Sequence, residues 1–293
     1  MRVAILTPDP ADPAHAGRWS EVRDRMVGPL AAEGIAVESF SWIGDPLALK
    51  GFDLVLPLTT WGYHRAYDQW RAMCDAWEFE GVRIQNPASV LRWNADKRYL
   101  ARLYDAEAPV IPTMYVDRFE PQHLHEAAVR FGVDRLIVKP QVSASAYQTL
   151  LVNTGDVVEG APQGPAMIQP YMDAVEGDGE LSLIFFGGEF SHAIRKVARA
   201  GDFRVQPEYG GHISAYEPDA DVLGAARRVL KEVEEPLLYA RVDLVRDPWG
   251  NPQLMELELI EPDLYLGFDP ERGAGFARAV RRAAETFAAA ASA

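Results

Sequence analysis

Hydrophobic and polar residues follow two different periods along the first third of the chain. Short apolar runs at residues 3–6, 35–40 and 54–56 predict buried strands. Between them, apolar residues recur at helical spacing in residues 17–32 and 66–79, which predicts two helices. Because strands that alternate with helices are typical of a parallel sheet, we predict an α/β lobe at the amino terminus.

In the remaining two thirds of the chain, strands also follow one another with only turn residues between them. The clearest turn signal is Gly187-Gly188, which separates two apolar runs and predicts a hairpin. The last helix is expected to bury Phe276, Val280 and Phe287 on its inner side. The expected strands are residues 113–116, 135–140, 167–172, 180–186 and 189–197, and the expected helices are residues 121–131, 221–234 and 272–293.

A second predicted hairpin, residues 237–262, carries an unusual set of charges. Two apolar runs flank a loop rich in Asp, Pro, Gly and Asn, which are turn formers. Side chains alternate between the two faces of a strand, so Arg241 and Asp243 share one face of the first strand. By the same rule, Glu256 and Glu258 share a face of the second strand. Three carboxylates and one arginine are therefore expected on one surface.

Two interpretations of this polar face are open. An antiparallel hairpin commonly buries one face and exposes the other, so the face could simply be solvated. Alternatively, a cation neutralises the repulsion among Asp243, Glu256 and Glu258. Mg²⁺ suits such oxygen ligands, since it is typically held by one or two carboxylates together with substrate phosphates. A phosphate site elsewhere in the chain would decide between the two.

The composition limits the class of protein and its partners. The chain has 293 residues with 48% hydrophobic content, which is enough for a substantial core. Its net charge of −14 argues against nucleic acid or an anionic membrane as the main partner, because both need a basic surface. No apolar run is long enough for a membrane span, and Cys74 is the only cysteine, expected as a small buried hydrophobe. We expect a cytoplasmic protein.

A candidate substrate site lies in the loop after the third strand. Thr59, Trp61 and Tyr63 follow that strand, at the edge of the sheet where open α/β folds bind ligands. Their hydroxyls and rings could hold a small polar molecule, or the two aromatic rings could only pack against neighbouring helices. A nicotinamide or flavin site is not expected, because the first strand is not followed by the glycine fingerprint of dinucleotide-binding folds.

Two lysines are candidate phosphate ligands. Asn94 is expected to cap a helix with Lys97 in its first turn, where a lysine opposes the helix dipole unless an anion is bound there. An ordinary surface lysine is the alternative. Lys139 ends an apolar strand, and the loop of residues 141–146 after it has small and hydroxyl residues but no Walker A motif. The basic run at residues 195–204 is expected to be a solvated face.

In this order along the chain, these features resemble the ATP-grasp superfamily, most closely its glutathione-synthetase-like branch with the ligases that add glutamate tails. The segments that carry the resemblance are the lysine-opened helix, Val-Lys-Pro, Gln-Pro-Tyr-Met, Gly-Asp-Phe-Arg, and Arg-Val-Asp followed by Met-Glu-Leu-Glu. The resemblance implies an α/β protein with the ATP-grasp fold. Its parts would be an amino-terminal parallel α/β lobe at residues 1–92, a central lid domain with its linker at 93–175, and a carboxyl-terminal α+β domain at 176–293.

The same resemblance implies ATP and Mg²⁺ as cofactors and assigns roles to individual residues. Two departures stand out: Glu258 replaces the usual Asn, and the phosphate loop lacks the usual glycines. The implied roles are Lys97 and Lys139 for the ATP phosphates; Gln169, Tyr171 and Met172 for adenine; Glu180 for ribose; Asp243, Glu256 and Glu258 for Mg²⁺; Arg241 for the tetrahedral intermediate, as in D-alanine:D-alanine ligases; and Arg204 for phosphate or substrate.

The implied reaction is that of a carbon–nitrogen ligase. ATP would convert a carboxylate into an acyl phosphate, which a nitrogen nucleophile then attacks. The amino-terminal segments TPDPADP and LPLTTWGYHRAYDQW further resemble the D-cycloserine-forming cyclo-ligases, which act on O-ureido-D-serine. An intermolecular amino-acid or peptide ligase and an inactive nucleotide-binding protein remain alternatives. The expected partner is a small amino-acid-like substrate, and a homodimer is left open.

Overall fold

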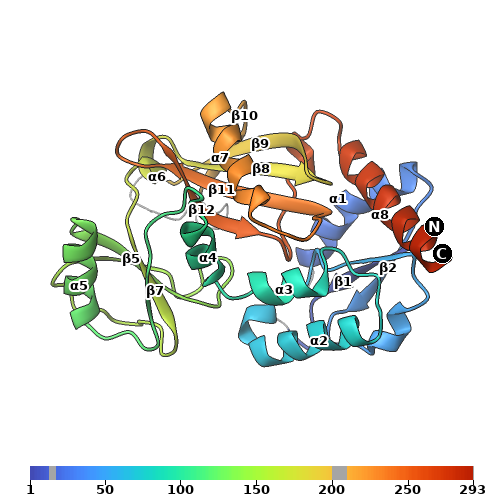
Figure 1. Cartoon of the computed structure of the whole chain (residues 1–293), viewed down its shortest axis with the longest axis horizontal. Coiled ribbons are helices and arrows are strands. Elements are labelled where there is room, and N and C mark those ends of the chain that lie inside the picture. Colours follow the sequence, from blue (N-terminus) through green and yellow to red (C-terminus); the bar gives the residue numbers. More distant parts are fainter. Residues whose placement is uncertain (13–17, 200–209, 293) are drawn as a thin grey trace.

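Three β-sheets with helices on their faces form the molecule in Figure 1, a computed structural model that describes residues 1–12, 18–199 and 210–292. One sheet belongs to the amino-terminal lobe on the right of the view. A second forms the small lobe at the lower left, and the third lies between them at the top. No helix in these ranges is long and apolar enough to cross a membrane. The domain boundaries expected at residues 92 and 175 stay predictions.

The amino-terminal lobe is the predicted parallel α/β structure. Its strand order is β2-β1-β3, and β1 pairs in parallel with both neighbours. The apolar run at residues 54–56 is buried at every position, as in parallel strands covered on both faces. Cys74 is buried as expected. The elements are β1 (Arg2–Thr7), α1 (Arg18–Ala32), β2 (Ala36–Ser41), η2 (Pro46–Leu49), β3 (Leu54–Leu56), η3 (Tyr63–Arg65) and α2 (Tyr67–Phe79).

Two short helices, α3 (Ala88–Asn94) and α4 (Tyr99–Asp105), lead out of this lobe and correct one prediction. Asn94 is the last residue of α3 and not the N-cap of a helix. Its side-chain amide donates to the carbonyl of Leu257 at 2.8 Å and accepts from the amide of Leu259 at 3.0 Å. An Asn side chain has both a donor and an acceptor, so it can complete a strand edge as readily as a helix end. Lys97 lies between the two helices.

The small lobe is an antiparallel sheet with the strand order β4-β7-β5-β6. Strand β7 ends at Pro170, two residues earlier than predicted, and β6 was not predicted. Helix α5 packs on this sheet through Leu124, Ala127 and Ala128. The elements are β4 (Met114–Val116), α5 (Gln122–Phe131), β5 (Arg135–Pro140), β6 (Leu150–Asn153) and β7 (Ala166–Pro170), followed by α6 (Ala174–Gly177).

The third sheet is antiparallel in the order β10-β9-β8-β11-β12, and it contains both predicted hairpins. Gly187 and Gly188 form the turn between β8 and β9 with φ values of 58° and 83°, a conformation that favours glycine. The elements are β8 (Glu180–Phe186), β9 (Glu189–Val197), β10 (His212–Tyr216), α7 (Ala220–Lys231), β11 (Tyr239–Arg246), β12 (Pro252–Glu258), η5 (Leu266–Phe268) and α8 (Ala274–Ser292).

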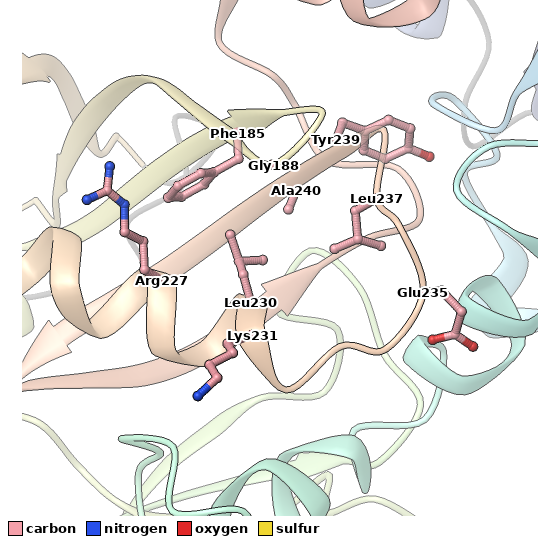
Figure 2. Close-up of a pocket in the computed structure, with 9 residues that line it drawn as sticks. All are labelled: Phe185, Gly188, Arg227, Leu230, Lys231, Glu235, Leu237, Tyr239 and Ala240. Atoms are coloured by element: carbon pink, nitrogen blue, oxygen red, sulfur yellow. The ribbon is translucent and has the colours of Figure 1, made fainter. Parts of the chain in front are cut away.

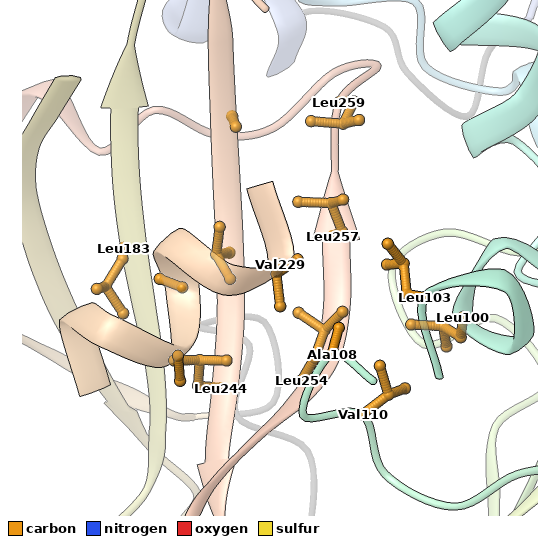
Figure 3. Close-up of a cluster of buried hydrophobic side chains, with 14 of the residues drawn as sticks. Leu100, Leu103, Ala108, Val110, Leu183, Val229, Leu244, Leu254, Leu257 and Leu259 are labelled. Carbon is orange, nitrogen blue, oxygen red and sulfur yellow. The ribbon is translucent and has the colours of Figure 1, made fainter. Parts of the chain in front are cut away.

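Helices cover this sheet and tie it to the rest of the molecule. On one face, α7 and α4 pack against alternate residues of the strands, including Leu183, Leu244 and Leu257 (Figure 3). Helix α8 buries Phe276 and Val280, as predicted, in a core shared with β1, β3 and α1 of the amino-terminal lobe. The other face of the β11–β12 hairpin is left for polar side chains.

Candidate active site

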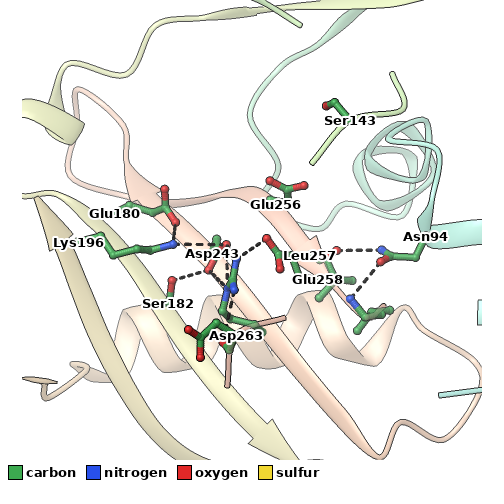
Figure 4. A network of polar contacts seen from close by, with 12 residues as sticks. Asn94, Ser143, Glu180, Ser182, Lys196, Asp243, Glu256, Leu257, Glu258 and Asp263 are labelled. Carbon is green, nitrogen blue, oxygen red and sulfur yellow. Dashed lines mark hydrogen bonds and ion pairs between the residues drawn. The ribbon is translucent and has the colours of Figure 1, made fainter. Parts of the chain in front are cut away.

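The register of β11 against β12 brings the predicted charges together. Arg241 lies opposite Glu258, and Asp243 lies opposite Glu256. All four side chains are therefore on one face, and Figure 4 shows Asp243, Glu256 and Glu258 near residues of β8 and β9. We call Arg241, Asp243, Glu256 and Glu258 the polar face. The predicted sharing of one surface is confirmed.

The polar face is not simply solvated. Arg241 and Asp243 are only 6% and 2% exposed, while the side chains of Glu256 and Glu258 remain about 30% exposed. The solvated interpretation is thus wrong for the two residues on β11. Buried charges need partners, because an isolated ion loses its hydration without compensation.

Arg241 and Asp243 find these partners in each other and in their neighbours. Arg241 donates through Nε and Nη2 to Asp243, at 3.0 and 2.9 Å, and it also binds Glu258. Ser182 on β8 donates to Asp243 at 2.5 Å. Burial by itself would raise the pKa of Asp243, but the charges of Arg241 and Lys196 hold that pKa below its usual value. Asp243 therefore stays ionised.

Glu258 is the least compensated member of the polar face. Burial raises its pKa to about 7; the positive charge of Arg241 opposes this rise, whereas the negative charge of Glu256 adds to it. Near neutral pH the carboxyl group would then be partly protonated. A cation bound beside it would favour the ionised form.

Lys196 on β9 belongs to the same network, although the sequence interpretation placed it on a solvated face. It is only 5% exposed and pairs with Glu180, which is 4% exposed, and its Nζ lies 3.8 Å from Asp243. The prediction of a solvated run is therefore wrong at Lys196. The turn at Gly187-Gly188 could not have predicted this pair, because a β-bulge between Ile184 and Phe185 shifts the register by one residue and so places Glu180 opposite Lys196. The ribose role of Glu180 stays a prediction.

Lys97 and Lys139 are buried, at 6% and 8% exposure, so Lys97 is not an ordinary surface lysine. The Nζ of Lys97 lies 2.9 Å from Glu256 and donates to the carbonyl of Ser143 at 2.6 Å. It thus joins the loop after β5 to the polar face. Burial lowers the pKa of Lys139 to about 8, with Glu256 opposing and Lys97 adding to the shift.

The predicted adenine residues lie at and after the end of β7. The Gln169 amide donates to the hydroxyl of Thr113 at 2.9 Å, and Met172 packs in a small core with Ile111. The guanidinium of Arg135 lies over the ring of Tyr171, with the Arg135 Cζ 4.3 Å from the ring centre. These contacts fix the segment between the small lobe and the third sheet. Its contact with adenine stays a prediction.

The predicted substrate loop is largely buried. Thr59 is fully buried and donates its hydroxyl to the carbonyl of Leu6 at 2.7 Å, which ties the ends of two strands. Tyr63 packs on Trp70 of α2, with ring centres 4.9 Å apart, as the packing interpretation expected. Trp61 is partly buried. Burial is the main cause that raises the pKa of Tyr63, and the negative charges of Glu261, Glu256 and Glu258 add to the rise. The Tyr63 hydroxyl is therefore close enough to the polar face for its charges to act on it.

Two residues complete this comparison with the sequence predictions. Arg204 lies in residues 200–209, outside the described part of the chain. Glu261 is a partly buried carboxylate that the sequence interpretation missed, because it follows the end of β12 and the alternation rule no longer applies. Burial and the negative charge of Glu258 raise its pKa well above the usual value. The site thus contains a fifth carboxylate.

The donors of the polar face suit Mg²⁺, but they are engaged elsewhere. Within the described residues no group of acidic, His or Cys side chains already converges as a metal site. Glu256 is paired with Lys97, and Asp243 is held by Arg241 and Ser182. The exposed parts of Glu256 and Glu258 offer the one or two carboxylates that Mg²⁺ uses beside phosphates. Asp243 could join them only if Arg241 released it.

A cavity of about 260 Å³ lies on the opposite side of the third sheet, against α7 (Figure 2). Phe185, Leu230 and Leu237 give it an apolar lining, and Arg227 and Lys231 carry the positive charges at its wall. None of the polar-face residues lines it. This cavity is therefore separate from the predicted site residues of the polar face.

Comparison with known proteins agrees with this geometry. Residues 3–86 match the family model of the D-cycloserine synthetase DcsG N-terminal domain. Over 273 residues the chain is 32% identical to the cycloserine biosynthesis protein DcsG of Streptomyces lavendulae, covering 84% of this chain and 88% of that protein. An identity of this size over most of both chains shows common family membership.

Solved structures show the same fold. The crystal structure of D-cycloserine synthetase DcsG matches with a TM-score of 0.82 at 26% identity, over 97% of this chain and 100% of that chain. D-alanine–D-alanine ligase from Bacillus anthracis, complexed with ATP, matches with a TM-score of 0.71 at 15% identity and 98% coverage of both chains. The fold and enzyme class predicted from the resemblance are confirmed: the chain belongs to the D-cycloserine synthetase (DcsG) family, and it is an ATP-grasp ligase.

Proposed function

We propose that this ATP-dependent ligase uses Mg²⁺ and closes O-ureido-D-serine into D-cycloserine. The observation that carries the proposal is the likeness to DcsG over 88% of that protein, which includes the amino-terminal lobe expected to select the substrate. The buried cations and carboxylates around the polar face support the chemistry, because phosphoryl transfer depends on positioning and charge neutralisation.

Binding of ATP would exchange one set of ion pairs for another. Lys97 and Lys139 would hold the phosphates, and Glu256 and Glu258 would hold Mg²⁺. Release of Lys97 from Glu256 both frees a carboxylate for the metal and provides a cation for the nucleotide. The bound metal would neutralise charge on the transferred phosphoryl group. Gln169, Tyr171, Met172 and Glu180 remain the proposed adenine and ribose ligands.

Arg241 is the proposed group for the second step, in which nitrogen attacks the acyl phosphate. Its guanidinium is oriented by Asp243 and Glu258, which reduces the freedom lost on reaching the reacting carbonyl. Nη1 makes one long hydrogen bond of 3.4 Å, to the carbonyl of Asp263. This nitrogen is therefore the part of the guanidinium that is best able to meet a developing oxyanion.

The proposed reaction balances without a second amine. The substrate carboxylate takes the γ-phosphoryl group, and the nitrogen bound to the side-chain oxygen attacks the same carbonyl carbon and expels phosphate. The carbamoyl group on that nitrogen is then removed by one water, giving carbon dioxide and ammonia. Because nucleophile and electrophile are in one molecule, ring closure has the effective-molarity advantage of a tethered reaction.

Mass spectrometry of a reaction with ATP, Mg²⁺ and O-ureido-D-serine as the only amino acid tests the proposal. The expected products are the isoxazolidinone ring, ADP and phosphate, with none of the ring formed when ATP is omitted. Turnover that starts only after a separate amine or amino acid is added would replace ring closure by an intermolecular ligase. ATP binding without turnover on any carboxylate in a panel of amino acids would instead indicate an inactive nucleotide-binding protein.

A further inference from the structure

Glu261 lies in a short segment whose backbone is fastened on both sides. Before it, the carbonyl of Ile260 accepts a hydrogen bond of 2.7 Å from the Tyr239 hydroxyl. After it, the carbonyl of Asp263 accepts from Arg241. These contacts connect the segment to β11, so the side chain of Glu261 starts from a fixed position next to the polar face. A group held in this way is preorganised for a ligand.

Among the described residues, the carboxyl group of Glu261 makes no hydrogen bond and no ion pair, and Glu261 is only partly exposed. By contrast, Asp263 in the same segment accepts from the amide of Tyr265 at 2.8 Å and lies 3.9 Å from Arg25. Without a cationic partner the carboxyl group tends to keep its proton, as its raised pKa indicates, and a cation that binds beside it would favour the ionised form.

Binding of ATP and Mg²⁺ would not provide a cationic partner for Glu261. Within the described residues, four cations and four carboxylates of the network balance in formal charge before Glu261 is counted, provided that all of them are ionised, as they would be around bound Mg²⁺. ATP with four negative charges and one or two Mg²⁺ adds a net charge of about −2 or zero, so it leaves no positive charge over for a fifth carboxylate. The balanced groups are Lys97, Lys139, Lys196 and Arg241 against Glu180, Asp243, Glu256 and Glu258.

We propose that Glu261 binds the α-ammonium group of the amino-acid substrate and thereby selects α-amino acids over other carboxylates. The inference rests on the proposed function for the substrate class. In an α-amino acid the ammonium nitrogen is only two bonds from the carboxyl carbon that receives phosphate. Its ligand must therefore lie beside the metal and phosphate groups, and Glu261 follows Glu258 by three residues.

The electrostatics agree with this position. The charges of Glu258 and Glu256 raise the pKa of Glu261 and those of Arg241 and Lys97 oppose the rise, so the carboxyl group is within range of the polar face. Its charge also reaches Tyr63 in the loop of the amino-terminal lobe. Glu261 thus lies where the lobe expected to select the substrate meets the hairpin expected to phosphorylate it. An ammonium ion there would relieve the repulsion that the carboxylates exert on one another.

The test combines two substrates with three forms of the enzyme. The substrates are O-ureido-D-serine and its des-amino analogue, which has hydrogen in place of the amino group. The wild-type protein should prefer the amino substrate in kcat/KM, and Glu261→Gln should reduce that preference by about 100-fold, as expected for loss of a charge-assisted hydrogen bond. Glu261→Asp, which keeps the charge, should restore part of the preference. KM for ATP should change little.

Glu234→Gln is the matched control, since the Glu234 side chain is 83% exposed and the chemical change is the same. The inference is overturned if Glu261→Gln slows both substrates equally or neither. If the wild-type protein does not turn over O-ureido-D-serine, the proposed function fails. The wild-type and Glu261 variants are then compared on whichever amino acid stimulates phosphate release and on its des-amino analogue. A wild-type enzyme that is stimulated equally by amino acids and their des-amino analogues would refute the role of Glu261.

Discussion

The two faces of the β11–β12 hairpin share one backbone but have opposite environments. On one face, Leu244 and Leu257 are fully buried against α7 and α4. On the other, Arg241 and Asp243 are almost as buried, yet they are charged and contact charged partners. Burial alone therefore does not separate the two faces. What differs is how each face compensates for losing water.

The comparison shows how one pair of strands can provide both stability and chemistry. The apolar face gains free energy from area removed from water, which does not depend on a ligand. The polar face replaces hydration by ion pairs, and buried ion pairs add little net stability. The ion pairs of the polar face can be replaced by ion pairs with a bound nucleotide and metal. No ligand can replace the apolar contacts of Leu257. Substitutions on the two faces should thus affect different measurements.

Glu256→Gln should give the largest effect, a fall in turnover of about 1,000-fold, since it removes a charge expected to hold Mg²⁺ beside the phosphates. The melting temperature should stay close to that of the wild type, because Gln keeps the shape of the side chain and an oxygen that can accept from Lys97, which also donates to the carbonyl of Ser143. Steady-state kinetics and thermal melting measure the two quantities, with Glu38→Gln, at an exposed ion pair, as the control. A loss of stability similar to that of a core substitution would show that the polar face holds the fold.

Leu257→Ala should give the reverse result. Removing its side chain from the core formed with α7 and α4 should lower the free energy of unfolding by about 2 to 5 kcal/mol. The protein that remains folded should keep most of its turnover at low temperature. Urea unfolding tests this, with the half-exposed Leu47→Ala as the control. An unfolding free energy within error of the wild type would contradict the assignment of this face to stability.

Lys139→Ala extends the comparison to the cations that face the hairpin. ATP affinity should fall by about 10- to 100-fold, as expected when a charge-assisted contact to phosphate is lost. Stability should rise slightly or stay constant, because burial disfavours the charged lysine in the ligand-free protein. Calorimetric titration with ATP gives the affinity. Unchanged binding would remove Lys139 from the nucleotide site.

The smallest effect is a pH dependence that Lys139 should impose on ATP binding. Its pKa is lowered to about 8, so the lysine is charged below pH 8 and neutral above it. ATP affinity should therefore decline by up to about tenfold between pH 7 and pH 9, and Lys139→Arg should flatten the decline because arginine stays charged. Parallel declines in both proteins would attribute the pH dependence to another group.

Several features of this protein were determined by local sequence patterns. Alternation in β11 and β12 predicted the shared face of Arg241, Asp243, Glu256 and Glu258, and the glycine pair predicted the β8–β9 turn. These predictions hold because strand periodicity and turn chemistry act over a few residues. The order of motifs also resembled the ATP-grasp superfamily, and the comparisons confirm that fold.

Other features depended on contacts between distant segments, so only the tertiary structure could decide them. Asn94 was expected to cap a helix, but its side chain completes the edge of β12, more than 160 residues away in the sequence. Lys196 was placed on a solvated face, and its burial depends on its position between Glu180 and Asp243. Local patterns report which face of an element a residue occupies. The charges and carbonyls that meet it there come from other parts of the chain, and they determine whether it is solvated, structural or part of the site.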